Sequence, residues 1–416
     1  MASITPDAAD LLALIKDVKQ KDASLGVKKV LAEVQAQQPT WLVSEKRVKK
    51  LMSDAGLVQT KAEPEVDASV PVSHVDAAVD VHALTQGKLK VRMINRLVGK
   101  GMFANEDLPK DMNLFTEFPF VYFPPWKRMT MVRKGDACGL CARTLKNGSI
   151  LVCGCPTCKR VRYCTKACRD TAWDSFHRFE CAAINPHIKA YMDFCEGETW
   201  NAGMGALRCY ERILIANEIS PEELKRVLKH LDAFATVSQE ERQKKETAWD
   251  MMGDQTYDMW KKALSLLVKA CKYPVEGLPA AKNGGSPQAV TKPLPDDVAN
   301  SIFTMDMYLK FLGRYNINNQ DGGLYLLHSS LNHACVPNVV IDHPGAGTNY
   351  GVTVRTLRPI KKGEELYITY CDPRWGRETR QQYLKTEYLF GCKCKRCQGA
   401  SDELGGELME AIFRLV

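Results

Sequence analysis

The chain has 416 residues, of which 45% are hydrophobic and 25% are charged, and its formal net charge is +8 at pH 7. This length predicts two or three structural units, and the composition is ordinary for a globular protein. Because no run of about 18 apolar residues is present, we expect no membrane-spanning helix. The first ten residues contain neither a basic region nor an apolar run, which argues against a secretory signal.

Residues 1–58 predict a helical N-terminal module of three helices, because apolar residues recur there with helical spacing. Ser44 is a suitable N-cap for the third helix, whose outer face carries Lys46, Arg47, Lys49 and Lys50. A solvated face or a protein-docking module is favoured over a nucleic-acid contact. Residues 59–87 are rich in Ala, Val, Asp and Pro and contain no aromatic residue, so they predict a flexible linker.

The remaining chain alternates strand-like, cysteine-rich and helical stretches. Short apolar runs between turn residues predict strands first, and a helical region follows the cysteines, with Ser220-Pro221-Glu222-Glu223 as a helix start. A further helix is expected at Val298–Leu312, after a loop at 277–296. The predicted segments are 88–137, 138–181, 182–300, 301–371, 372–398 and a tail at 399–416.

The 16 cysteines are clustered, with eight between Cys138 and Cys181 and three between Cys392 and Cys397. Without a secretion signal, such clustering indicates metal binding rather than disulfides, and hence the nucleus or the cytoplasm. Four ligand pairs stand out: Cys138 and Cys141, Cys155 and Cys158, Cys164 and Cys168, His177 and Cys181. Since structural zinc takes four sulfur or nitrogen ligands, four pairs predict two closed sites with no catalytic position. The remaining cysteines are expected to be small apolar core residues: Cys195, Cys209, Cys271 and Cys371.

The stretch from Cys155 to Cys181 resembles a MYND finger, including Tyr163 and Trp173. That family interleaves its pairs. The resemblance therefore implies two ligand sets: Cys138, Cys141, Cys164 and Cys168 for one zinc, and Cys155, Cys158, His177 and Cys181 for the other. Two departures are visible: an extra Cys153 competes with Cys155, and the gap before His177 is one residue longer than expected.

Three further motifs follow the order of a SET domain. They are Gly99-Lys100-Gly101 in the stretch 97–104, Asn332-His333-Ala334-Cys335 in the stretch 331–338, and Gly363-Glu364-Glu365-Leu366 before Tyr370. The second resembles the NHSC motif of SET domains, with Ala334 in place of serine. Two glycines allow the backbone to pass close to a ligand, and Asn and His offer mixed donors and acceptors.

A fourth motif contains Phe390, Cys392, Cys394 and Cys397. Three cysteines cannot complete a tetrahedral zinc site, and Cys335 is the natural fourth ligand, an arrangement that recurs in SET proteins with a post-SET segment. A metal there would tie the tail to the NHAC loop and build one wall of the active site. Phe390 would then lie over the adenine of the cofactor.

Together the motifs resemble the SET-and-MYND lysine methyltransferases over residues 88–398, and most of all the short branch that includes fungal histone methyltransferases. The resemblance implies an α+β SET fold of short sheets with a pseudoknot. A MYND finger and a helical insert interrupt this fold, and a post-SET zinc segment closes it. It implies S-adenosylmethionine and three zinc ions as cofactors, and Tyr370 as the catalytic residue. The implied cofactor-binding residues are Val98, Gly99, Lys100, Gly101, Asn332, His333, Tyr370 and Phe390.

The implied reaction is methyl transfer to a lysine, which must be neutral to attack; an apolar channel lowers its pKa. Tyr315 and Tyr325 are further candidates for that channel. The expected substrate is a histone tail, most of all that of the fourth core histone, with a ribosomal or other protein as the alternative.

Two rival functions remain. One is a non-catalytic adaptor with a degenerate SET core, whose finger binds a Pro-rich peptide. The other is a nucleic-acid-binding protein that uses the third helix and the basic residues of the finger: Lys159, Arg160, Lys166, Arg162, Arg169 and Arg178. The intact GKG, NHAC and Tyr370 argue against degeneration.

Overall fold

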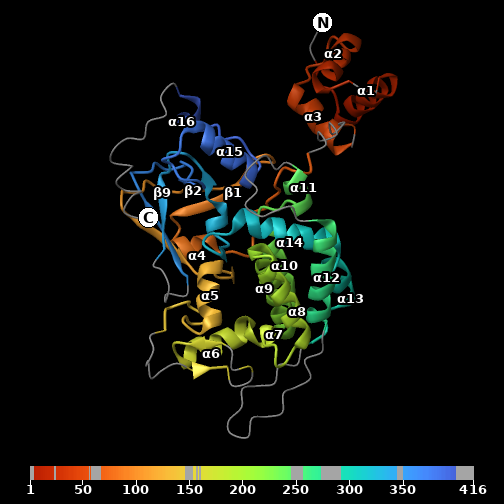
Figure 1. The fold of residues 1–416 in the computed structure, drawn as a ribbon. Coiled ribbons are helices and arrows are strands. Elements are labelled where there is room, and N and C mark those ends of the chain that lie inside the picture. The colour runs from red at the N-terminus through yellow and green to blue at the C-terminus, as the bar shows by residue number, and fades with distance from the viewer. Residues whose placement is uncertain are drawn as a thin grey trace. The chain divides into compact units, whose positions relative to one another are not determined.

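A computed structural model of the chain divides it into two compact units, Met1–Asp67 and Ala68–Val416, which are described separately (Figure 1). The structure describes residues 4–22, 25–55, 57, 67–145, 153–155, 158, 161–244, 256–272, 292–343 and 350–399. Most of the predicted loop at 277–296 and almost all of the tail lie outside these residues.

Three helices form the first unit: α1 Ala8–Lys21, α2 Val27–Gln37 and α3 Glu45–Asp54. Their buried apolar residues recur at helical spacing and meet in one core: Leu11, Ile15, Val18, Val30, Val34, Val48 and Met52. The Ser44 side chain accepts a hydrogen bond from the Arg47 N–H at 3.3 Å and so caps α3. Arg47 donates to the Pro6 carbonyl at 2.7 Å, so its guanidinium is turned toward the module itself.

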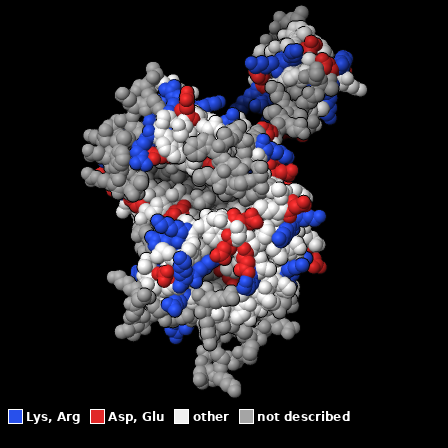
Figure 2. Space-filling model, in the orientation of Figure 1, with Lys and Arg blue, Asp and Glu red and all other residues white. Residues whose placement is uncertain are grey.

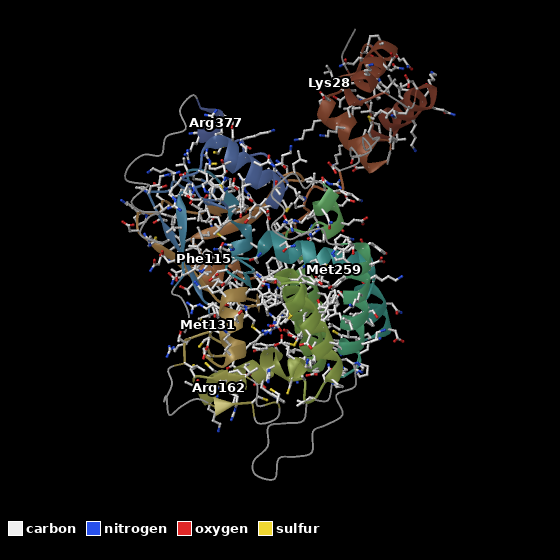
Figure 3. All side chains as sticks on the ribbon, in the orientation of Figure 1. Lys28, Phe115, Met131, Arg162, Met259 and Arg377 are labelled. Carbon is white, nitrogen blue, oxygen red and sulfur yellow. The ribbon has the colours of Figure 1, made fainter. Side chains whose placement is uncertain are left out.

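The second unit contains small sheets of short strands. β1 and β2 form an antiparallel hairpin, β10 lies between β3 and β9, β4 pairs with β7, and β8 pairs in parallel with β11. Phe115 of β3 belongs to the core of this β half (Figure 3). The bounds are β1 Leu89–Asn95, β2 Gly99–Ala104, β3 Asn113–Glu117, β4 Val121–Tyr122, β7 Gly323–Leu324, β8 Asn332–His333, β9 Val339–Asp342, β10 Val352–Thr356 and β11 Tyr367–Ile368.

Most helices of the second unit pack around a larger apolar core. Met131 and Met259 both pack against this core (Figure 3). None of the described helices has the length and apolar character needed to cross a membrane. The bounds are α4 Val81–Thr85, α5 Trp126–Lys134, α8 Pro186–Gly197, α9 Asn201–Ile219, α10 Pro221–Ala233, α11 Gln239–Lys244, α12 Tyr257–Cys271, α13 Asp296–Ile302, α14 Met305–Asn318, the 3-10 turn η2 His328–Ser330, α15 Arg377–Glu387 and α16 Lys395–Gln398.

N-cap side chains set where two of the helices begin. Ser220 caps α10 as predicted, accepting from the Glu223 N–H at 3.1 Å. The single helix predicted at Val298–Leu312 is wrong, because the chain forms α13 and α14 instead. Thr304 caps α14 by accepting from the Met307 N–H at 3.2 Å, and this cap interrupts an apolar pattern that is otherwise continuous.

The predicted linker at 59–87 is wrong for residues 68–87, which belong to the second unit. Residues 68–80, here named the strap, pair with the chain after α10: Val72 and Thr236 exchange backbone hydrogen bonds of 2.9 and 2.8 Å. Asp80 then caps α4. The segment was predicted to be a linker because it has no aromatic residue. Backbone pairing requires no aromatic side chain, so composition alone did not reveal that the segment is structured.

Candidate active site and metal-ligand groups

The finger brings its eight predicted ligands into two groups of four, with all ligand atoms of a group within 4.8 Å of one another. Each group combines two pairs that are distant in sequence, in the interleaved order that the resemblance implied: Cys138, Cys141, Cys164 and Cys168, and Cys155, Cys158, His177 and Cys181. Cys153 begins strand β5 (Cys153–Gly154), which pairs with β6 (Arg162–Tyr163). The Cys153 side chain lies outside the described residues.

The extra residue before His177 has a local structural explanation. Between α6 (Lys166–Ala172) and α7 (Arg178–Glu180) the chain forms a π-helical turn, Trp173–His177. A π turn accommodates one more residue than an α turn, so the insertion is absorbed within the helix. His177 Nε2 consequently reaches Cys158 Sγ at 3.5 Å.

A third group joins Cys335 to Cys392, Cys394 and Cys397, again within 4.8 Å. The Cys335 Sγ lies 3.5 Å from that of Cys397 and 3.9 Å from that of Cys392. The sequence reasoning missed Arg380, a fully buried residue of α15 whose Nε donates to Cys335 Sγ at 3.2 Å. Arg380 also donates to the Trp375 carbonyl, so its buried guanidinium has hydrogen-bond partners in the core.

A cavity of about 320 Å³ lies where the motifs meet, a volume at the lower end of the range for small-molecule sites. It is bounded by the β2 segment, the turn before β8, the segment after β11, the end of α14 and α15. Its lining residues are Ser73, Val98, Lys100, Ala235, Ile317, Asn318, Asn319, Gln320, His328, Ser329, Leu331, Asn332, Ile368, Thr369, Tyr370, Cys371, Asp372, Trp375, Tyr383 and Tyr388.

Tyr370 is held in the cavity wall by two hydrogen bonds. Its hydroxyl donates to the Leu331 carbonyl at 2.7 Å, and its backbone N–H donates to His333 Nδ1 at 3.0 Å. Its ring lies 4.6 Å from that of Tyr388. Burial raises the pKa of Tyr370, so the phenol stays protonated and its oxygen lone pairs remain available as acceptors.

Asn332 connects the NHAC and GKG segments. Its side-chain amide donates to the Lys100 carbonyl at 3.0 Å and to Glu365 Oε1 at 2.8 Å. The parallel pairing of β8 with β11 places Asn332 opposite Tyr367. A side chain at position 101 would clash, since a Cβ there would lie 2.8 Å from Glu365 Oε1. Any larger residue at this position would require Glu365 and Ile94 to shift.

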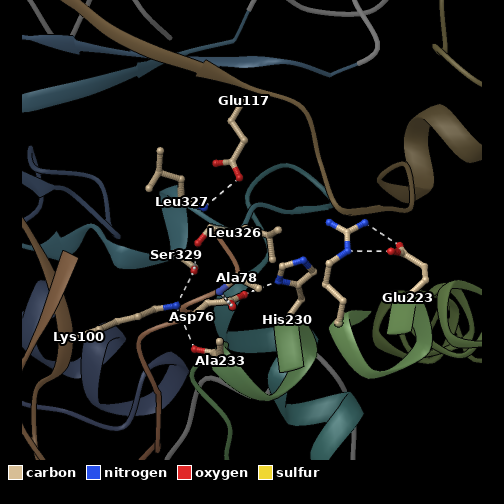
Figure 4. A network of polar contacts seen from close by, with 11 residues as sticks. Asp76, Ala78, Lys100, Glu117, Glu223, His230, Ala233, Leu326, Leu327 and Ser329 are labelled. Atoms are coloured by element: carbon tan, nitrogen blue, oxygen red, sulfur yellow. Dashed lines mark hydrogen bonds and ion pairs between the residues drawn. The ribbon is translucent and has the colours of Figure 1, made fainter. Parts of the chain in front are cut away.

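Lys100 is a buried cation in the cavity wall (Figure 4). Its Nζ donates to the Ala233 carbonyl at 2.9 Å and to Ser329 Oγ at 3.0 Å. Within the described part of the chain no carboxylate forms an ion pair with it. Burial lowers the pKa of Lys100 to about 8, although the negative charges of Asp76 and Glu117 act in the opposite direction.

The predicted cofactor-binding residues separate into two sets. Val98, Lys100, Asn332 and Tyr370 line the cavity, whereas Gly99, Gly101, His333 and Phe390 lie beside it without lining it. The Phe390 ring is 6.1 Å from the ring of His333 and 6.4 Å from that of Tyr370.

Tyr315 and Tyr325, which the sequence suggested for the channel, are not among the residues that line this cavity. The Tyr315 hydroxyl donates to the Gly322 carbonyl at 3.1 Å, and the Tyr325 hydroxyl donates to the Tyr350 carbonyl at 2.7 Å. The aromatic residues that do line the cavity with Tyr370 are Trp375, Tyr383 and Tyr388.

His328 is a second lining residue that the sequence reasoning missed. It is 6% exposed, and neither ring nitrogen has a hydrogen-bond partner among the described residues. Burial lowers the pKa of His328 to about 3, so the imidazole is neutral. Only its position in the turn before the NHAC motif could have drawn attention to it.

The basic residues of the finger are partly neutralised. Arg178 pairs with Glu218 at 2.6 Å and Arg169 with Asp170 at 2.7 Å, while Lys159 and Arg160 lie outside the described residues. Arg162 and Lys166 are exposed. Basic and acidic side chains are interspersed over the helices on the face drawn in Figure 2. This distribution does not favour the nucleic-acid-binding alternative.

Comparisons with known proteins identify the fold family. A family model described as SET domain matches residues 99–371. The chain is 28% identical over 411 residues to the histone-lysine N-methyltransferase SET5 of Yarrowia lipolytica, covering 96% of this chain and 83% of that protein. It is 28% identical over 413 residues to SET5 of Meyerozyma guilliermondii, with coverages of 95% and 79%. A crystal structure of the SET domain of LSMT bound to lysine and AdoHcy covers 73% of this chain and 53% of that one, with a TM-score of 0.32 and 11% identity.

Proposed function

The chain belongs to the SET domain family, and we propose that it is an S-adenosylmethionine-dependent histone-lysine N-methyltransferase with Tyr370 as its catalytic residue. The observation that carries the proposal is the position of Tyr370. Its hydroxyl is fixed by the Leu331 carbonyl in the wall of the same cavity that Asn332 and Lys100 line.

The cavity residues fit the cofactor. Lys100 offers a buried cation, without an ion-pair partner among the described residues, to the carboxylate of the cofactor's amino-acid end. Asn332 fixes the Lys100 backbone. We assign the cofactor to Val98, Gly99, Lys100, Gly101, Asn332, His333, Tyr370 and Phe390. When bound, S-adenosylmethionine supplies an electrophilic methyl group on a sulfonium.

The chain's own contribution is orientation and exclusion of water. Because the Tyr370 O–H is committed to Leu331, its lone pairs can face the target amine and align it. The rings of Trp375, Tyr383 and Tyr388 provide an apolar wall, which lowers the pKa of a lysine ammonium that enters and so favours the neutral, reactive amine. The substrate lysine ammonium releases its proton to the solvent as it enters the cavity, which leaves the neutral amine.

The three ligand groups fit zinc, because each offers four sulfur or nitrogen donors converging within 4.8 Å. We assign two zinc ions to a MYND-type finger and the third to a post-SET segment that holds residues 392–397 against the NHAC loop. All three are structural, since four protein ligands leave no position for a reacting water.

The test is Tyr370→Phe. We expect kcat to fall by a factor of about 100 or more while the variant still folds and keeps its zinc content, because positioning terms of this kind are worth several kcal/mol. The measurement is transfer of labelled methyl groups from S-adenosylmethionine to histones. Wild-type turnover in a folded, zinc-loaded variant would remove Tyr370 from the mechanism.

The target is assigned from the relatives, which are named histone-lysine N-methyltransferases. The tail of the fourth core histone is the favoured substrate and the nucleus the favoured compartment. Labelled cofactor added to an extract of cells that lack the enzyme, followed by mass spectrometry of the labelled band, identifies the substrate. Labelling of a ribosomal or other protein in place of histones would replace this assignment.

A further inference from the structure

The strap forms part of the cavity wall although it precedes the residues that the SET domain model matches. That match begins at residue 99, whereas Ser73 lies in the strap and lines the cavity. Ser73 is only 8% exposed. The strap is held there by the backbone pairing of Val72 with Thr236 and by a hydrogen bond from the His74 N–H to the Ala233 carbonyl at 3.4 Å.

Ser73 contacts the GKG segment directly. Its Oγ accepts a hydrogen bond from the Lys100 backbone N–H at 3.2 Å. Gly99 adopts a φ of +80°, and a Cβ at that position would lie 2.3 Å from Ser73 Oγ. The hydroxyl thus occupies the space that a side chain at 99 would fill, and it fixes the backbone from which the Lys100 side chain enters the cavity.

Asp76 supplies the second contact of the strap (Figure 4). Its carboxylate is 8% exposed, contacts His230 Nδ1 of α10 and accepts from the Ala78 N–H at 2.9 Å. Its negative charge helps to keep Lys100 protonated. Glu117 of β3 acts in the same direction, and the Ala233 carbonyl that accepts from Lys100 Nζ ends α10, where the helix dipole is negative.

We propose that the strap is a built-in part of the cofactor site, in which Ser73 positions Lys100 and the Asp76 carboxylate, held by His230, lies near the Lys100 side chain (Figure 4). The inference rests on the proposed function, since it takes the carboxylate of S-adenosylmethionine as the group that Lys100 binds. Ser73 and Asp76 act through Lys100 and are positioning residues.

The test measures binding of S-adenosylhomocysteine, which carries the same carboxylate, to the full zinc-loaded chain by calorimetry. We expect Ser73→Ala to weaken binding about threefold to tenfold, the effect of one lost hydrogen bond. Ser73→Thr keeps the hydroxyl and should restore affinity. Val75→Ala, an exposed position of the same strap, is the control and should bind like the wild type.

The effect of Asp76→Asn is measured as the pH dependence of S-adenosylhomocysteine binding. Asn keeps the acceptor for the Ala78 N–H but removes the charge, so Lys100 should lose its proton, and the chain its affinity, at a lower pH than in the wild type. Asp80→Asn removes a charge from the strap while retaining an N-cap for α4, and it should leave the profile unchanged.

The outcomes separate the two proposals. If the wild-type chain fails to bind S-adenosylhomocysteine, the proposed function itself fails. If the wild type binds but folded Ser73→Ala and Asp76→Asn behave like their controls, the role of the strap is refuted while the proposed function stands. Circular dichroism and zinc content establish that each variant is folded.

Discussion

The finger and the cavity region both contain groups of four potential metal ligands. The two regions differ in how far apart in the sequence the ligands of a group lie. All eight ligands of the finger lie within residues 138–181, whereas the third group links Cys335 to Cys392, 57 residues further along. The ligands of the finger thus all come from one short segment of the chain. The cavity is closed by a long-range group together with partly buried hydrogen bonds such as Asn332 to Lys100 and Tyr370 to Leu331.

This difference indicates which single substitutions should affect the cavity. Loss of a finger group removes a local clamp from a segment that lines no part of the cavity. Loss of the third group frees residues 392–397 from the loop that follows Asn332 and His333. It also uncouples α15, which carries the lining residue Tyr383. Activity should therefore depend on the two kinds of group unequally.

The largest effect should come from Cys335→Ser. Because structural zinc contributes on the order of 10 kcal/mol to the segment that it folds, we expect loss of one zinc ion per chain, loss of cofactor binding and turnover reduced at least about 100-fold. The matched variant Cys141→Ser should also lose one zinc but keep cofactor affinity within about threefold of the wild type. Zinc analysis and calorimetry measure both. Equal loss of cofactor binding in the two variants would contradict the comparison.

The sequence predicted the ligand sets and the motif residues better than it predicted the walls between them. Cysteine pairs and the GKG, NHAC and Tyr370 motifs can be recognised from short stretches of sequence, and the structure brings them together in ligand groups and around the cavity. Ser73, His328 and Arg380 are common residues whose role arises only from what folds against them. Tyr315 and Tyr325 also show this dependence on distant contacts, because their hydroxyls donate to the backbone carbonyls of Gly322 and Tyr350.

The same contrast explains the errors in the fold. The N-caps Ser44 and Ser220 depend on contacts within one turn, and both were predicted. The strap depends on pairing with Thr236, more than 150 residues away, as does the contact of Asp76 with His230, separated by 154 residues. Composition-based reasoning cannot detect partners at that distance.

A second prediction sharpens the comparison through His328, a buried polar group of the cavity region. Its pKa is about 3 in the folded chain and near 6.5 when exposed, so the unfolded chain binds a proton first as the pH falls. The folded chain should therefore lose about 4 kcal/mol between pH 6.5 and pH 3 through this residue. In His328→Leu that contribution disappears. Urea unfolding of both proteins at several pH values measures the difference, and parallel acid profiles would contradict the assignment.

Lys100 gives a smaller effect of the same sign in a higher pH range. Burial lowers its pKa from 10.5 to about 8, so below pH 8 the folded chain bears the full cost of a buried ammonium. Between pH 8 and 10.5 the unfolded chain binds more protons, and the folded state gains stability as the pH rises, by about 3 kcal/mol in total. Lys100→Met should lack this gain. Unfolding without cofactor at pH 7.5 and 9.5 tests it, and an unchanged difference between the two proteins would refute it.

The smallest effect concerns Arg380, which distinguishes the third group from a purely local clamp. Its fully buried guanidinium donates to Cys335 Sγ at 3.2 Å and reaches Cys397 Sγ at 3.9 Å, so it both neutralises and orients the ligands. Contacts of this kind are worth about tenfold to 100-fold in metal affinity. Arg380→Lys keeps the charge but loses the fork of donors. With a chelator, one zinc of three should therefore leave the variant faster, while the finger releases its two ions at the wild-type rate. Faster release of all three ions would mean that the finger and the third group are coupled. That result would contradict the distinction between the locally closed finger and the cavity closed by distant residues.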